Sequence, residues 1–229
     1  DAFTKRWSNF IVGYSFKTNS LPYVLTLLKD KGAYAEVVSE PEYRLAIKMG
    51  YDIDKIIING PYKGVMALEE CLNNGSIVNL DSFHEIEWIK NNPPKQGKEW
   101  KVGLRINFDL ENYCKGETIM GNEPGRFGFN IENGSFNRAL KKLKDIPYVK
   151  VVGIHGHHST RTKSLNIFKV ISEKLSEIGM VIGENLEYID IGGCIFGDKP
   201  GAPSFDEYAK IIVDKLEKNF DAEKVALIL

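Results

Sequence analysis

A lysine, Lys17, ends the first apolar run of this sequence. A lysine amine that is buried in a cavity loses part of its affinity for a proton, and it can then attack a carbonyl group. Amines of this kind form Schiff bases with carbonyl compounds. Lys17 is therefore a candidate nucleophile, although an exposed lysine at the end of a strand would have the same local sequence.

A pair of histidines, His155 and His157, ends a later apolar run. Residues two apart on a strand share a face, so two imidazoles there could bind a metal, as in a metal-dependent hydrolase. They could equally be structural, or one could stack on an aromatic cofactor while Ser159 and Thr160 reach a phosphate. His84, the one histidine outside this run, is expected early in a helix, which leaves few further ligands for a metal.

Two glycines, Gly192 and Gly193, follow the next apolar run of the chain. Glycines in such a turn let backbone amides approach an anion closely and form a phosphate nest. Tight turns also use paired glycines. Their position favours a phosphate site, because barrels commonly bind phosphate at the loops after their late strands.

The elements that must position these residues follow a regular alternation. Short runs rich in Val, Ile and Leu predict strands at 9–15, 35–39, 55–59, 76–80, 101–108, 149–157, 186–191 and 224–229. Such continuous apolar runs are typical of parallel strands buried on both faces. With helices between them, eight strands predict a (β/α)8 TIM barrel, and a doubly wound open sheet is the alternative.

Several helices are predicted between these strands, at 22–31, 41–49, 86–90 and 208–218. Ser/Glu pairs three residues apart predict capping boxes at the starts of three of them, with Ser39, Ser82 and Ser204 as the N-caps. Residues 109–133 are the least regular segment and too long for an ordinary barrel loop. We expect this segment to be functional or to face a partner.

A barrel carries its chemistry at the carboxyl ends of its strands. The polar and glycine residues at those ends are Lys17, Asn19, Glu36, Ser39, Asn59, Asp81, Arg105, Asn107, His155, His157, Gly192 and Gly193. We therefore expect one polar ring around the mouth of the barrel.

The bulk properties of the 229 residues exclude several classes of partner. A net charge of -1 gives no attraction to nucleic acid or to an anionic membrane. Apolar stretches stay well below the ~20 residues that span a bilayer. The three cysteines are odd in number and far apart, so we expect reduced thiols and a cytoplasmic protein.

These motifs together resemble the fold-type III pyridoxal-phosphate-dependent decarboxylases, the family of diaminopimelate and ornithine decarboxylases. The resemblance keeps the family's order over essentially the whole chain. Its motifs are Tyr14-Ser15-Phe16-Lys17-Thr18-Asn19, Glu36-Val37-Val38-Ser39, Arg105-Ile106-Asn107, Arg126-Phe127-Gly128, the run from Gly153 to Thr160, and Asp190-Ile191-Gly192-Gly193-Cys194.

The resemblance implies a role for each of the matching site residues. Lys17 would carry pyridoxal 5'-phosphate as a Schiff base, and His157 would stack on the pyridine ring. Thr160 would take the place of the family's phosphate-binding serine. The phosphate would be held by the backbone amides of Gly192, Gly193 and Cys194, in the loop after the seventh strand. The side chains of Glu36 and Arg105 would line the ring.

The departures from the family pattern concern the phosphate site and the chain end. His158-Ser159-Thr160 replaces Ile-Gly-Ser, and Cys194 replaces a third glycine. The family's Glu-Pro-Gly-Arg motif, whose Glu holds the pyridine nitrogen, follows the last strand, where this sequence ends at Leu229. The string Glu123-Pro124-Gly125-Arg126 follows the fifth strand instead, and we assign it no cofactor role.

The resemblance thus implies one pyridoxal-phosphate-binding barrel domain over residues 1–229, without the family's C-terminal β domain. The implied activity is that of a carboxy-lyase acting on a small diamino acid such as diaminopimelate, lysine or ornithine, in lysine or polyamine metabolism. The full-length protein is expected to be a homodimer, and the isolated chain to be catalytically incomplete. A racemase or a non-decarboxylating pyridoxal-phosphate-binding protein of the same fold would share Lys17, whereas a metal-dependent hydrolase would use His155 and His157.

Overall fold

The computed structural model describes residues 2–121, 125–197 and 199–229. Its strands are β1 (Phe10–Ile11), β2 (Gly13–Ser15), β3 (Tyr34–Val37), β4 (Ile56–Ile58), β5 (Ile77–Leu80), β6 (Trp100–Asn107), β7 (Phe129–Asn130), β8 (Val149–His155), β9 (Tyr188–Asp190) and β10 (Ala226–Ile228). Its α-helices are α1 (Pro22–Asp30), α2 (Glu40–Lys48), α3 (Val65–Asn74), α4 (Phe83–Asn91), α5 (Ser135–Lys144), α6 (Leu165–Ile182) and α7 (Phe205–Leu216).

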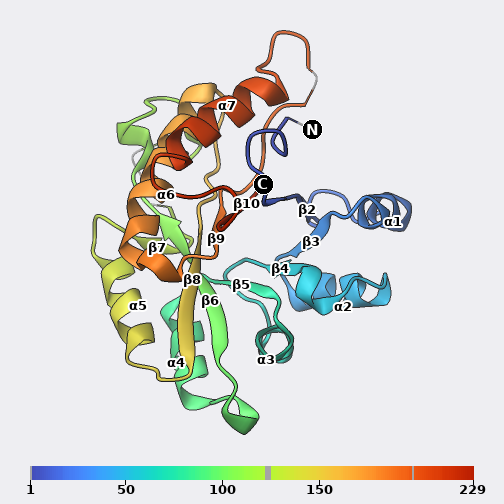
Figure 1. Ribbon diagram of the computed structural model, residues 1–229, viewed down its shortest axis with the longest axis vertical. Helices are drawn as coiled ribbons and strands as arrows, with labels where there is room; N and C mark the ends of the chain where they lie inside the picture. Colours follow the sequence, from blue (N-terminus) through green and yellow to red (C-terminus); the bar gives the residue numbers. More distant parts are fainter. Residues whose placement is uncertain (1, 122–124, 198) are drawn as a thin grey trace.

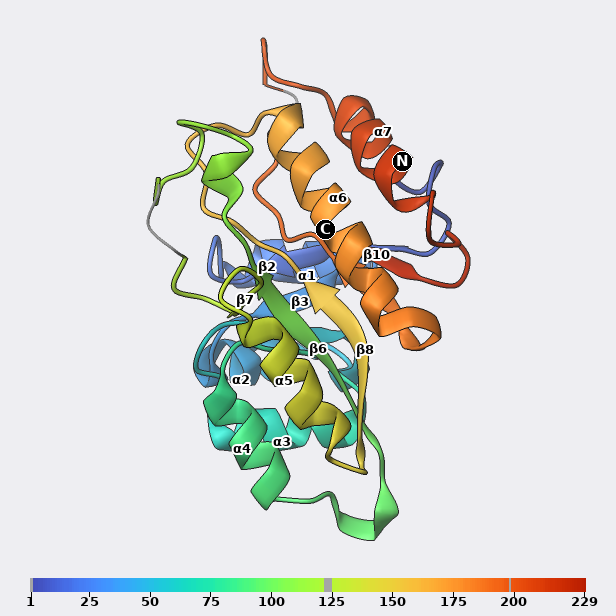
Figure 2. The same cartoon turned by 90° about the vertical axis from the view of Figure 1, so that its left-hand side faces the viewer.

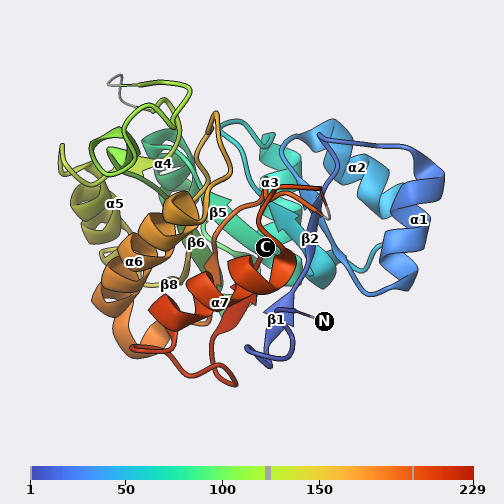
Figure 3. The same cartoon turned by 90° about the horizontal axis from the view of Figure 1, so that it is seen from above.

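The strands form a closed parallel barrel with the helices around it (Figures 1 and 3). β1 pairs with β10, and β2 pairs with β3. Because only Val12 separates β1 from β2, the two act as one barrel strand, which pairs with β10 on one side and with β3 on the other. This closure confirms the predicted (β/α)8 barrel and rules out the open doubly wound sheet.

Each predicted strand is present, with ends that differ by at most two residues. The central residues of β4 are completely buried, as expected for a strand with the core on one face and the barrel interior on the other. The interior holds Tyr188, packed with Ile57 and Val152. A Cβ atom at Gly103 or Gly153 would lie 2.1 or 2.0 Å from the Tyr188 side chain, so these glycines make the room for its ring.

The predicted capping boxes have different outcomes. At α7, Glu207 N donates to Ser204 Oγ and Ser204 N donates to the Glu207 carboxylate, as predicted. At α4, Glu85 accepts from the backbone N–H of Ser82. At α2 the predicted reciprocal box is wrong, because the carboxylate of Glu42 reaches one residue further back and accepts from the backbone N–H of Val38.

The described residues of the irregular segment 109–133 lie at one side of the barrel mouth (Figure 2). It contains a short 3-10 helix, Leu110–Asn112, and then β7, which pairs in parallel with the end of β6 through Ile106 and Phe129. Within the described ranges, no helix is both long and apolar enough to cross a membrane. Cys71, Cys114 and Cys194 are all free thiols.

Candidate active site

A cavity of about 720 Å³ opens at the carboxyl ends of the strands. Three predicted site residues, Lys17, Arg105 and His157, lie in its wall. They come from the ends of β2, β6 and β8, which the barrel brings together although they are far apart in sequence. The volume falls in the range of ~300–1,000 Å³ that is typical of small-molecule sites.

The side chain of Lys17 is exposed. The exposure fits the alternative of an exposed lysine at the end of a strand. Because Lys17 also lines the cavity, its role as the lysine that holds the cofactor stays a prediction.

His155 and His157 lie side by side but have different surroundings. Their rings are nearly parallel, with an interplanar angle of 13° and centroids 6.4 Å apart, as the shared strand face requires. His155 is buried, and its Nδ1 lies 2.9 Å from the Asp190 carboxylate. His157 lines the cavity, and burial, reinforced by the charges of His155 and Arg105, lowers its pKa to about 3. Its ring is consequently neutral at physiological pH.

A glycine supports the His157 ring from behind. A Cβ atom on Gly192 would lie 2.7 Å from Nδ1 of His157, and Gly192 has a φ of +66°, which side chains rarely tolerate. The backbone N–H of Gly192 donates to the Asp190 carboxylate over 2.9 Å. The expectation that this amide is available to a phosphate is therefore not met, because Asp190 already occupies it.

The rest of the predicted phosphate loop retains the backbone shape of glycine. Cys194 has a φ of +77°, the left-handed conformation, and is the non-glycine residue with positive φ among those described. Cys194, which replaces the family's third glycine, thus adopts a conformation that glycine favours and carries conformational strain. Thr160 forms an isolated antiparallel bridge with Thr118.

Several predicted cofactor residues lie outside the cavity lining as it stands. They are Glu36, Thr160, Gly192, Gly193 and Cys194, whereas Ser159 and His158 do line it. Glu36 belongs instead to a buried polar layer beneath the mouth. Asn59 Nδ2 donates to Glu36 Oε1, and Asn79 Nδ2 donates to Asn59 Oδ1.

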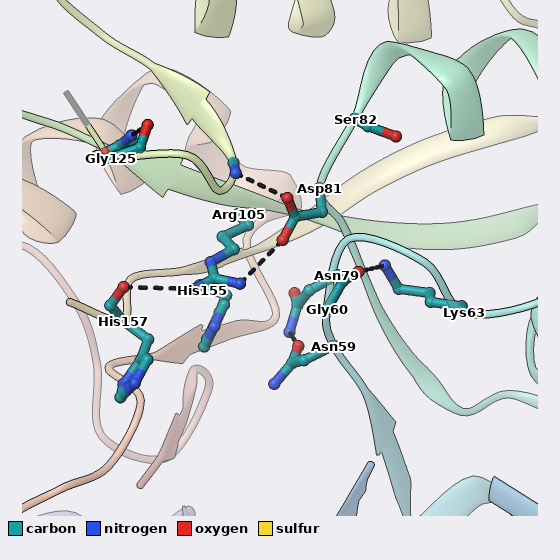
Figure 4. A network of polar contacts seen from close by, with 12 residues as sticks. Asn59, Gly60, Lys63, Asn79, Asp81, Ser82, Arg105, Gly125, His155 and His157 are labelled. Atoms are coloured by element: carbon teal, nitrogen blue, oxygen red, sulfur yellow. Dashed lines mark hydrogen bonds and ion pairs between the residues drawn. The ribbon is translucent and has the colours of Figure 1, made fainter. Parts of the chain in front are cut away.

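The cavity cation Arg105 is held by a buried carboxylate. Arg105 Nη1 lies 2.9 Å from Asp81 Oδ2, and Nη2 donates to the backbone carbonyl of His157 over 3.5 Å (Figure 4). The ring of Phe127 lies 4.8 Å from the guanidinium carbon. These contacts fix the guanidinium at the edge of the cavity.

A buried lysine, Lys63, was not predicted to belong to the site. Its ammonium donates to Glu85 Oε1 over 2.6 Å and to the carbonyl of Gly60 over 2.7 Å, next to the cavity wall. Glu85 also accepts from the backbone N–H of Asp81. No signal in the sequence indicated this pair, because a lysine between a proline turn and a helix has the local pattern of an exposed residue.

The segment 109–133 supplies much of the cavity wall. Its lining residues are Asp109, Leu110, Glu111, Thr118, Met120, Gly121, Gly125, Arg126, Phe127, Asn130, Glu132 and Asn133. This supports the expectation that the segment is functional. Glu123 and Pro124, of the string to which we assigned no cofactor role, lie outside the described residues. Among the described residues, no cluster of three or more His, Cys, Asp or Glu side chains could hold a metal ion.

Comparisons with known proteins identify the family of this chain. Residues 1–229 match a protein-family profile described as the pyridoxal-binding domain of pyridoxal-dependent decarboxylases. A probable chloroplastic diaminopimelate decarboxylase of Oryza sativa is 34% identical over 188 residues, which cover 80% of this chain and 38% of that protein. The diaminopimelate decarboxylase of Zymomonas mobilis is 28% identical over 210 residues, covering 88% of this chain and 49% of that protein.

A solved structure shares the fold. It is the diaminopimelate decarboxylase of Methanocaldococcus jannaschii, with a TM-score of 0.80 and 25% identity over all of this chain and 56% of the other. This chain thus spans about half the length of the curated relatives it matches. The family profile names pyridoxal as the bound group, which identifies the cofactor as pyridoxal phosphate. The chain belongs to the pyridoxal-dependent decarboxylase family, as its pyridoxal-binding barrel domain.

Proposed function

We propose that this barrel binds pyridoxal phosphate at Lys17 and that the protein containing it decarboxylates a small diamino acid. The observation that carries the proposal is the convergence of Lys17, Arg105 and His157 on one cavity. The names of the relatives favour diaminopimelate over lysine and ornithine as the substrate.

The charges of the cavity fit an anionic cofactor. Three acidic residues of the wall are already bonded within their own segment: Glu132 accepts from Asp109 N, Glu111 accepts from Gly116 N, and Asp109 accepts from Asn112 Nδ2. The cations of the lining are Lys17, Arg105 and Arg126. These hydrogen bonds hold the carboxylates in place without cancelling their charge, and Arg105 is already paired with Asp81. Among the described residues, Lys17 and Arg126 are the lining cations that form no ion pair, so they can attract a phosphate or a substrate carboxylate.

The neutral ring of His157 fits a flat aromatic partner. A ring with a pKa of about 3 adds no positive charge beside the pyridine, and its near-parallel stacking on His155 holds its plane fixed. Phosphate donors would be the Gly193 and Cys194 amides and the Ser159 hydroxyl. Thr160, bridged to Thr118, would reach a phosphate only if this loop moves.

When bound, pyridoxal phosphate supplies an electron sink for the electron pair of the breaking bond between Cα and the carboxylate. Within this chain, Lys17 Nζ would hold the cofactor, and His157 would orient the ring. Arg105 would stabilise negative charge at the cavity edge, and the segment 109–133 would limit the access of water.

Product analysis tests the function and separates it from racemisation, its strongest alternative. The protein would be incubated with pyridoxal phosphate and with diaminopimelate, lysine or ornithine in turn. Carbon dioxide release with one of them is the expected result. Loss of optical activity without carbon dioxide would instead identify a racemase, and the absence of both reactions in a longer chain that carries a β domain would contradict an enzymatic role.

A further inference from the structure

The carboxylate of Asp81 joins two separate walls of the cavity. Its Oδ2 lies 2.9 Å from Arg105 Nη1, and its Oδ1 accepts the backbone N–H of Gly128 over 2.8 Å. Asp81 is buried, with only 2% of its side chain exposed, so water cannot replace either partner. One carboxylate at the end of β5 therefore holds a side chain of β6 and the backbone of the segment 109–133.

The segment meets Arg105 closely on the other side as well. A Cβ atom on Gly128 would lie 2.7 Å from the carbonyl oxygen of Arg105 and 2.9 Å from its Cγ. The preceding residue, Phe127, stacks its ring over the guanidinium. Only a glycine permits this approach, which the positive φ of +77° also requires.

We propose that Asp81 is a positioning residue that sets the Arg105 guanidinium and the backbone of residues 127–130 in one arrangement. One carboxylate oxygen binds Arg105 and the other binds the Gly128 N–H, so the position of the cation and the position of the wall that covers it are coupled. This inference deepens the proposed function, because it names what orients the cation that would meet the cofactor or the substrate carboxylate.

The two contacts of Asp81 can be separated by substitution. Asp81→Asn keeps one oxygen, which can accept from Gly128, but presents an amide N–H₂ to a guanidinium that needs an acceptor. Asp81→Ala removes both contacts. Glu42→Gln is the matched control, because it changes another carboxylate that accepts a backbone N–H at the start of a helix but contacts neither Asp81 nor Arg105.

Amide hydrogen exchange, measured on cofactor-free protein, reports on the hydrogen bond between Asp81 and the Gly128 N–H. We expect Asp81→Ala to speed exchange of the amides of residues 127–129 by about tenfold or more, since a buried hydrogen bond to a charged acceptor is lost. Asp81→Asn and Glu42→Gln should leave these rates within about threefold of the native protein. Unchanged exchange in Asp81→Ala, or equal acceleration in Glu42→Gln, would overturn the proposal.

The affinity for pyridoxal phosphate, measured by titration, reports on the ion pair between Asp81 and Arg105. Asp81→Asn and Arg105→Gln should each weaken binding by about tenfold or more. The variant with both changes should bind no more weakly than Arg105→Gln alone, because Asp81 acts through that side chain. It also leaves no unpaired buried charge, so it remains informative if Asp81→Ala does not fold.

Losses that multiply in the double variant would show that Asp81 acts independently of Arg105 and would contradict the proposal. Because exchange is measured without cofactor, it tests Asp81 separately from the proposed function. Native protein that fails to bind pyridoxal phosphate, yet shows the predicted exchange pattern, would contradict the function and leave the positioning of the wall intact.

Discussion

His155 and His157 are two residues apart, but only the second faces the cavity. His155 is buried against the Asp190 carboxylate, 2.9 Å away, and its ring forms the layer beneath His157. The division between an inner, paired imidazole and an outer, neutral one explains why a family motif carries two histidines while one meets the cofactor in our proposal.

We predict that His157→Ala weakens pyridoxal phosphate binding by about tenfold or more, since it removes the stacking face. His155→Ala should weaken it much less, provided that the variant folds. Both affinities are measured by absorbance titration. The reverse order of the two effects would show that His155 is the residue that meets the ring.

The histidines also predict how stability depends on pH. Burial lowers the pKa of His157 to about 3 and that of His158 to about 4, whereas both residues titrate near 6.5 in an unfolded chain. Between these values the unfolded chain binds protons that the folded protein does not bind. The free energy of unfolding therefore falls as pH decreases from about 6.5 toward 4.

Each histidine contributes at most about 1.4 kcal/mol per pH unit, because the unfolded and folded states differ by at most one proton on it. Urea unfolding at pH 7, 6 and 5 should show a shallower decline for His157→Phe than for the native protein. His84→Asn, an exposed histidine outside the site, is the control and should follow the native curve. Parallel curves for all three proteins would contradict the neutral, buried state of His157.

The sequence could identify Lys17, Arg105 and His157 because their motifs lie at strand ends. It could not reveal Lys63, whose burial depends on Glu85, 22 residues away, reaching the same point in space. It also could not show that Asp190 would occupy the Gly192 amide, because side-chain direction in a turn is set by packing.

At the scale of elements, the turn after β9 is the part of the site with stored strain. Cys194 adopts φ +77°, which costs a residue with a side chain about 1–2 kcal/mol. Glycine removes that strain but gains freedom in the unfolded chain, so the two effects partly cancel.

We predict that Cys194→Gly raises the free energy of unfolding by about 0.5–1 kcal/mol, measured by urea denaturation. Gly192→Ala is the opposite test in the same turn and should destabilise the protein, since its Cβ would meet the His157 ring. A destabilised Cys194→Gly would mean that the thiol makes a compensating contact.

Strands were the elements that the sequence predicted best. Runs such as Ile56–Ile58 must be buried on both faces of a closed sheet, so their composition alone indicates their place. The start of α2 was predicted less well, because Glu42 can bond the N–H of Ser39 or that of Val38, and a local pattern does not distinguish the two. The placement of β7 against β6 depended on Gly128 and Asp81, which are 47 residues apart.

At the scale of the whole molecule, the barrel carries the cavity at its mouth. The chain spans about half the length of its curated relatives, and Lys17 is exposed. We propose that a second, β-rich domain and a partner subunit of a homodimer cover this mouth. In such a closed site the reacting groups would be shielded from water.

We predict that residues 1–229 alone bind pyridoxal phosphate but release carbon dioxide from diamino acids at least about a hundredfold more slowly than a longer chain with the β domain. The rates are compared under identical conditions, and cofactor binding by the short chain is the control for folding. Equal turnover would mean that the barrel supplies every group the reaction needs.

The central claim is that Lys17 carries the cofactor, and a chemical label tests it most directly. The protein is loaded with pyridoxal phosphate, reduced with borohydride to fix the cofactor on the lysine that holds it, digested, and mapped by mass spectrometry. We predict the label on the peptide containing Lys17 and its loss in Lys17→Ala, while Lys63→Met, if folded, retains it. A stoichiometric label on any other lysine of the native protein would contradict the account.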